Sequence, residues 1–95
     1  MFLSFEWDRR KEESNRRKHG ISFREASTVF ADPLGATMDD PDHSASENRL
    51  LHMGLSIYGR LIVVSYTERK ERVRIISARQ ATRREQRQYE ETESG

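Results

Sequence analysis

Apolar and polar residues alternate at the start of the chain, and the period then lengthens. The odd positions of residues 2–7 are apolar, which predicts a short, half-buried strand. A helix over 9–19 follows, with Asp8 as its N-cap and Gly20 as the left-handed residue that ends it. This helix carries no aliphatic side chain. We therefore expect it to lie on the surface or to be held by a partner.

A second helix is indicated directly afterwards. Ser22 and Glu25 have the spacing of a capping box, in which a hydroxyl and a carboxylate satisfy the first free N–H groups. Phe23, Ala26 and Phe30 then recur at the spacing of one helix face. This helix should pack on the core until an Asp-Pro pair ends it.

The middle of the chain contains an acidic segment followed by strand-like runs. Residues 34–48 are small and acidic and contain Pro41, so they predict either a loop or a weak edge strand. Beyond them, tight turns separate three strand-like runs, which indicates an antiparallel meander. These runs lie near 49–55, 60–68 and 72–79.

A last helix begins at Thr82, which forms a second capping box with Glu85, and should run to about Glu91. Residues 92–95 should fray. The order β-α-α-β-β-β-α predicts an α+β fold, in which two N-terminal helices and one C-terminal helix accompany an antiparallel sheet of about four strands. Ninety-five residues, of which 34% are hydrophobic, predict one domain (1–95) with a thin core.

Charge is strongly segregated along the chain, although the net charge is only +1. Residues 9–24 carry +5, residues 31–48 carry −5 and residues 49–87 carry +7. Either these blocks form a basic face that attracts polyanions, or they neutralise each other across the fold. The chain has no cysteine and no apolar run long enough to cross a bilayer. We therefore expect a cytoplasmic protein that makes no membrane contact.

Fourteen arginines against three lysines favour planar recognition of phosphates. Arg79 is the first candidate, because it ends a strand just before a helix whose first N–H groups attract anions. Arg74, on the same strand, is the second candidate, and Arg83 is the third. Trp7 and Tyr66 either stack on the bases of a nucleic acid or pack in the core.

Other residues are candidates for transferring protons in a catalysed reaction. Lys18 and His19 end the first helix, where their charge either serves catalysis or interacts with the helix dipole. His43 lies in the acidic segment and is either a catalytic group or an ordinary loop histidine. Glu47 and Arg49 point to the same side of an extended chain, as a base with a phosphate clamp or as a surface ion pair.

The acidic segment does not predict a metal site. Asp39, Asp40, Asp42 and His43 offer ligands, but Pro41 interrupts them and no second ligand cluster exists elsewhere. We expect a solvated loop, and neither a metal nor a cofactor. The loop could instead cover part of the basic surface and order the entry of a nucleic acid. The remaining histidine, at position 52, lies on a strand between apolar neighbours and should be structural.

Short motifs recur over residues 5–90 in the order and spacing of a known family. They are FEWD at 5–8, Lys11 and Asn15 before KHG at 18–20, SFREA at 22–26, DDPDHS at 39–44, Glu47 and Arg49, GLSIYGR at 54–60, VVSYTER at 63–69, RIISARQATRRE at 74–85, and Tyr89-Glu90. As an ordered set they resemble the BrnT family, the toxin half of bacterial type II toxin–antitoxin pairs.

The resemblance implies a RelE-like fold and a ribonuclease activity that arrests translation. It also implies a BrnA-like antitoxin with a ribbon-helix-helix part, a heterotetramer with two copies of each chain, and contact with operator DNA through the antitoxin alone. RNA can be cut without a metal when its 2′-hydroxyl attacks the adjacent phosphate, so we expect a metal-independent endoribonuclease whose guanidinium groups converge at one concave site. The alternative is a non-catalytic basic module that binds a partner protein or a nucleic acid.

Overall fold

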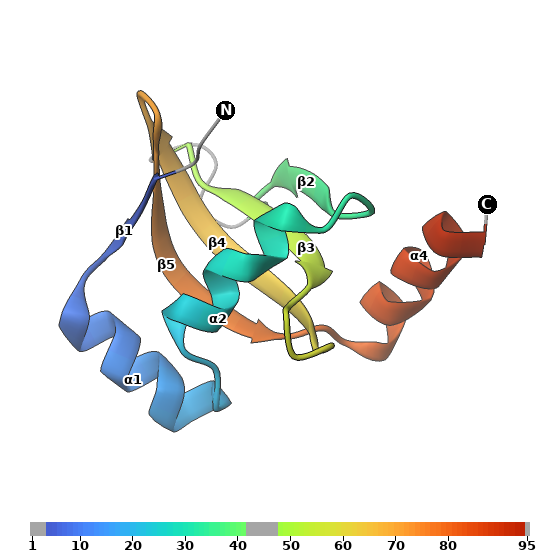
Figure 1. The fold of residues 1–95 in the computed structure, drawn as a ribbon, viewed down its shortest axis with the longest axis horizontal. Coiled ribbons are helices and arrows are strands. Elements are labelled where there is room, and N and C mark those ends of the chain that lie inside the picture. The colour runs from blue at the N-terminus through green and yellow to red at the C-terminus, as the bar shows by residue number, and fades with distance from the viewer. Residues whose placement is uncertain (1–3, 42–47, 95) are drawn as a thin grey trace.

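The strands form one twisted sheet. The computed structural model describes residues 4–41 and 48–94. Among these residues, five strands lie in the order β1-β5-β4-β3-β2 (Figure 1). Their bounds are Ser4–Trp7 (β1), Ala36–Asp39 (β2), Leu50–Leu55 (β3), Leu61–Arg69 (β4) and Arg72–Gln80 (β5). The α+β fold is confirmed. The sheet has one strand more than predicted, because part of the segment expected as a loop or edge strand pairs with β3 as β2.

The sheet is mixed, which corrects the prediction of an antiparallel one. Strands β3, β4 and β5 form the predicted antiparallel meander. By contrast, β1 lies parallel to β5, with Ser4 opposite Arg72 and Trp7 opposite Ile75. Sequence spacing predicts the pairing of neighbouring strands only, and β1 and β5 stand at opposite ends of the chain.

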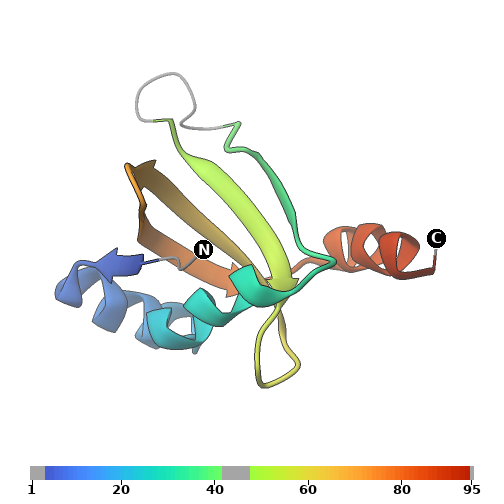
Figure 2. The ribbon, with the colours of Figure 1, turned by 45° about the horizontal axis from the view of Figure 1, so that its top comes forward.

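The helices begin and end close to where the sequence places them. They are α1 (Arg9–His19), α2 (Phe23–Thr28), the short 3-10 helix η1 (Val29–Ala31) and α4 (Arg83–Ser94). Asp8 caps α1 by accepting from the N–H of Lys11 at 3.0 Å, and Gly20 ends that helix with φ 70°. Figure 2 shows α1 and α2 on the same side of the sheet, whereas α4 lies beyond the end of β5. Helix α4 also passes its predicted end at Glu91.

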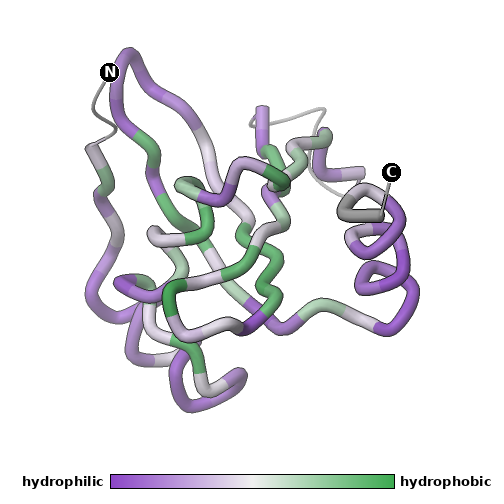
Figure 3. The backbone as a smooth tube through the Cα atoms, turned by 45° about the vertical axis from the view of Figure 1, so that its right-hand side comes forward, coloured by the Kyte–Doolittle hydropathy of each residue, from purple (hydrophilic) through white to green (hydrophobic). Residues whose placement is uncertain are grey.

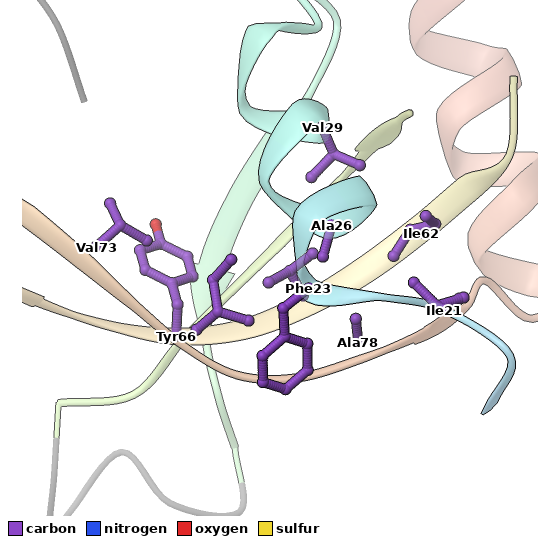
Figure 4. Close-up of a cluster of buried hydrophobic side chains, with 10 residues drawn as sticks. Ile21, Phe23, Ala26, Val29, Ile62, Tyr66, Val73 and Ala78 are labelled. Atoms are coloured by element: carbon purple, nitrogen blue, oxygen red, sulfur yellow. The ribbon is translucent and has the colours of Figure 1, made fainter. Parts of the chain in front are cut away.

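The core lies between α2 and the middle of the sheet (Figure 4). Phe23, Ala26 and Val29 are fully buried on the α2–η1 segment, each with 0% exposure. They contact buried side chains of β4 and β5, which are Ile62, Val64, Tyr66, Val73, Ile75 and Ala78. Figure 3 shows this apolar centre with hydrophilic chain at α1, α4 and the β4–β5 hairpin. Within the described part of the chain, no helix is long and apolar enough to cross a membrane.

Helix α1 is attached to the sheet by a polar side chain. The Asn15 amide nitrogen donates to the carbonyls of Ile21 (3.0 Å) and Ala78 (2.9 Å), and its oxygen accepts from the Ala78 N–H at 3.1 Å. Strand β1 ends opposite Ile75, so the edge of β5 is open at Ala78. Asn15 satisfies the backbone groups that β1 no longer reaches. The helix is therefore held within its own chain, although it lacks an aliphatic face.

Candidate functional site

A hollow of about 680 Å³ lies where β3 begins, β4 ends and β5 begins. Four basic residues and one acidic residue contribute to its wall, and we call it the basic hollow. Its lining residues are Lys11, Asn48, Arg49, Thr67, Glu68, Arg69, Arg74 and Ile76. Such a concentration of positive charge in a concave surface attracts phosphate groups.

The β4–β5 hairpin supplies the largest part of the wall. Thr67 is paired with Arg74 across the ladder, and Arg69 is paired with Arg72 at the turn. Because side chains alternate along a strand, Thr67 and Arg74 point away from the buried face that carries Tyr66. Lys70 has φ 55° and closes the turn in the left-handed conformation. The hairpin thus places Arg69 and Arg74 on the open face of the sheet.

Two other elements complete the wall. Lys11 lies in the first turn of α1, which the Asp8 cap and the Asn15 contacts fix against β5. Arg49 lies directly before β3, after Asn48 with φ 50°. Residues that are far apart in the sequence therefore meet in one place.

The charges in and beside the basic hollow are only partly neutralised. Arg74 donates to Glu6 of β1 at 2.9 Å, and the more distant Arg72 contacts the same carboxylate at 3.4 Å. These hydrogen bonds, the one from Arg74 above all, hold the pKa of Glu6 below its usual value. Among the described residues, the side chains of Lys11 and Arg69 have no carboxylate partner within 4.0 Å, although Glu68 contributes to the same wall.

Arg79, the first phosphate candidate from the sequence, lies outside the basic hollow. Its guanidinium donates two hydrogen bonds to Glu85, at 2.8 and 3.0 Å. Glu85 also accepts from the N–H of Thr82 at 2.8 Å, and the Arg79 hydrogen bonds lower the pKa of Glu85 to about 2. This arrangement fastens the end of β5 to α4. Arg83, the first residue of α4, is exposed and does not line the hollow.

Among the described residues, the remaining candidates do not gather with Arg49 and Arg74. Lys18 and His19 are exposed in the last turn of α1, about 10 Å along the helix axis from Lys11. Tyr66 is 3% exposed and belongs to the core, and Trp7 is 37% exposed with its ring edge against Phe23. His43 and Glu47 lie outside the described residues.

His52 has the structural environment that its strand position predicts. Its Nδ1 is 2.8 Å from the Thr37 hydroxyl, and its ring stacks on Phe30 at 4.5 Å. Burial lowers the pKa of His52, which favours the neutral ring. In the described part of the chain, no three His, Asp or Glu side chains gather as a metal site requires, while Asp42 and His43 lie outside that part.

The sequence reasoning missed Lys11 and Arg69 as members of the site. Lys11 and Asn15 are spaced i,i+4, which places both on one helix face, and a buried Asn15 would have turned that face toward the sheet. A two-residue hairpin at Lys70-Glu71 pairs Arg69 with Arg72 and thus brings Arg69 toward Arg74. The Lys11–Asn15 spacing and the hairpin turn can both be read from the sequence. They identify the site only once the first helix and the hairpin are placed next to each other in the fold.

Comparison with known proteins identifies the family. The family model described as the ribonuclease toxin BrnT of type II toxin–antitoxin systems matches residues 7–85. The crystal structure of the Brucella abortus ribonuclease toxin BrnT superposes with a TM-score of 0.67 and 20% identity, covering 86% of this chain and 100% of that one. No curated protein sequence matches. The superposition shows a shared fold, and the family match extends over most of the chain, including Lys11, Arg49, Arg69 and Arg74. The chain therefore belongs to the BrnT family of ribonuclease toxins of type II toxin–antitoxin systems.

Proposed function

We propose that this chain is a metal-independent endoribonuclease that binds RNA in the basic hollow, cuts it and thereby inhibits translation. The observation that carries the proposal is the convergence of Lys11, Arg49, Arg69 and Arg74 on one concave surface. These residues come from a helix, a loop and two strands, so their meeting is a property of the fold. A hollow of about 680 Å³ also lies within the range of small-ligand sites, roughly 300–1,000 Å³, and can hold a nucleotide unit.

The chemistry follows from the charges. When the 2′-hydroxyl attacks the adjacent phosphate, a crowded dianionic phosphorane forms, and nearby guanidinium groups stabilise that charge. Arg69 and Arg74 are suited to bind the phosphate oxygens, while Lys11 can lie beside the attacking or leaving oxygen. These cations supply the electrostatic stabilisation that a metal ion supplies in other nucleases.

The proton-transfer groups are a separate part of the proposal. His43 and Glu47 lie outside the described residues, and in the sequence they stand just before Arg49, which lines the basic hollow. Lys18 and His19, at the far end of α1, are better placed to bind the RNA backbone than to act on the same phosphate. Arg79, Arg83 and Trp7 remain candidates for contacts outside the hollow.

The family implies an antitoxin partner and an RNA substrate. We propose that the partner is BrnA-like, with a ribbon-helix-helix part that dimerises and binds operator DNA. Two toxins and two antitoxins then form a heterotetramer in the cytoplasm. Within the described residues, α1 and α4 are the long helices, and both carry acidic as well as basic side chains. This mixture supports operator contact through the antitoxin.

The test is RNA cleavage by the purified chain in the presence of EDTA. Arg69→Ala and Arg74→Ala should each lower cleavage and RNA affinity by roughly tenfold or more, because a charged contact to phosphate contributes about 1.5–3 kcal/mol. Arg87→Ala is the matched control, since Arg87 is exposed on α4 outside the hollow and should have little effect. With four cations engaged, log affinity for single-stranded RNA should fall with log salt with a slope of about −3.

Three results would count against the proposal. Cleavage that EDTA abolishes and added metal restores would remove the metal-independent mechanism. RNA binding without cleavage, together with growth that induced expression does not slow, would favour the non-catalytic basic module. Equal losses in Arg87→Ala and Arg74→Ala would show that general charge, and not the hollow, determines RNA binding.

A further inference from the structure

The end of the sheet opposite the basic hollow carries exposed apolar side chains. Leu34 and Leu55 are 36% and 38% exposed, and Ile57 and Tyr58 are both 71% exposed. These four residues, which we call the apolar stripe, follow the η1–β2 loop, the end of β3 and the β3–β4 turn. Large apolar side chains that gather in this way on a small domain indicate an interaction site.

One partly buried carboxylate fixes the first half of the stripe. Asp32 accepts from the N–H of Leu34 at 2.9 Å and from the N–H of Leu55 at 2.8 Å. The Tyr89 hydroxyl of α4 donates to the same carboxylate at 2.6 Å. The two leucines therefore stand beside each other on backbone that three elements hold in place.

A second polar network fixes the turn that carries Ile57 and Tyr58. The N–H of Ile57 donates to the Thr28 hydroxyl at 3.0 Å, and the Ser56 hydroxyl donates to Glu25 at 2.8 Å while accepting from the N–H of Tyr58. Arg60 closes the turn with an ion pair to Glu25. The turn is consequently held in a conformation that keeps both apolar side chains in water. Such preorganised anchors lose little entropy when a partner covers them.

The charges around the stripe indicate what kind of partner fits. Glu25 and Asp32, the carboxylates beneath it, are directed inward by their hydrogen bonds. Arg24 is exposed one helical turn before Thr28, whereas the charge of Arg60, at the base of the turn, is paired with Glu25. The surface is thus apolar, with Arg24 as its positive margin. It complements an amphipathic segment whose aliphatic side chains are flanked by carboxylates, and it offers a protein more than it offers a polyanion.

From this complementarity we infer that the antitoxin docks on the apolar stripe through such an acidic amphipathic segment. The inference rests on the proposed function, since it takes the antitoxin as the partner. Ile57 and Tyr58 serve as the buried anchors of the interface, and Arg24 contributes to its charged margin. RNA and antitoxin then occupy different ends of the same sheet.

The test uses the antitoxin encoded beside this toxin, produced with the full chain. Ile57→Ser with Tyr58→Ser should weaken the toxin–antitoxin complex at least about 30-fold, while RNA cleavage by the free toxin stays unchanged. Arg24→Glu should weaken the complex most at low salt. Met38→Ser is the matched control, because Met38 is 46% exposed on β2 outside the stripe and its loss should not change binding.

Each other result of this experiment leads to a different conclusion. If the wild-type toxin binds the antitoxin and the double variant binds it equally well, the inference fails while the proposed function stands. A variant that loses RNA cleavage while it remains folded would assign the stripe to the substrate instead. Wild-type toxin that forms dimers without antitoxin, and that the double variant renders monomeric, would show that a second copy covers the stripe. If the wild-type chain neither cleaves RNA nor binds the antitoxin, the proposed function itself fails.

Discussion

Replacing Asn15 with leucine should detach α1 from β5, because this side chain makes the polar contacts that hold the helix. Three hydrogen bonds are lost, and the Ile21 carbonyl and both backbone groups of Ala78 are left unsatisfied. Each such bond contributes about 1 kcal/mol, and a stranded buried group costs about 1–3 kcal/mol. Leucine has a better helix propensity than asparagine, which stabilises the helix by only about 0.5 kcal/mol. Taken at the lower end of that range, the three unsatisfied groups and the small propensity gain together give a loss of about 3 kcal/mol, a large part of the 5–15 kcal/mol typical of a domain.

The assay is thermal and urea unfolding followed by circular dichroism. A loss of about 3 kcal/mol corresponds to a melting temperature lower by roughly 12–24 °C for a domain of this size. Ser14→Ala is the control, since Ser14 is the exposed neighbour on the same helix. Amide exchange should locate the effect at Ala78, whose N–H loses its acceptor. A drop below about 1 kcal/mol, with Ala78 still protected, would refute the view that Asn15 replaces β1 along this edge.

Further predictions concern charge and pH. Glu6→Gln should tighten RNA binding, measured by fluorescence titration, because it removes the carboxylate that competes for Arg74; unchanged or weaker binding would contradict this. Glu85 has a pKa of about 2 against an ordinary 4.5, so its contribution to stability is complete above about pH 4.5 and is lost toward pH 2. Glu85→Gln should flatten that part of the acid unfolding curve, and an unaltered curve would argue against the Arg79–Glu85 contact. His52 has a pKa below its ordinary 6.5, so urea stability should fall as pH drops below about 6.5. His52→Phe should abolish this dependence, and a dependence that persists in the variant would exclude His52 as its source.

Local rules predicted the elements well, because each boundary has its own residue. Asp8 and Gly20 delimit α1 at the predicted positions, and Ser22 begins α2 by accepting from the N–H of Glu25. The parallel β1–β5 pair escaped prediction because no local signal links residues at opposite ends of the chain. Strand β2 was predicted only as an alternative to a loop, since Ala36–Asp39 has four residues and is exposed throughout.

The site was harder to predict than the fold, because an arginine can either line the hollow or hold a carboxylate elsewhere in the structure. Arg74 and Arg79 lie on the same strand and look alike in the sequence, yet one lines the basic hollow and the other holds Glu85. The capping-box spacing of Thr82 and Glu85 was recognised, but the same carboxylate also binds Arg79, which spacing alone does not reveal. An arginine can be assigned to a ligand only once the carboxylates within its reach are known.

The separation of the two surfaces constrains how an antitoxin could silence the toxin. Strand β4 runs from Leu61, beside the β3–β4 turn, to Arg69 in the basic hollow, and its nine residues span about 27–30 Å. An antitoxin anchored on Ile57 and Tyr58 therefore needs roughly nine further residues in extended form to reach the hollow and exclude RNA. If the antitoxin stops short of that length, RNA should still bind the complex, and inhibition must come from the second toxin of the proposed heterotetramer or from an indirect effect on the basic hollow. Shortening the antitoxin from its free end separates these mechanisms. Restored cleavage with the complex intact indicates direct blocking, whereas unchanged inhibition until the anchor is removed indicates an indirect effect.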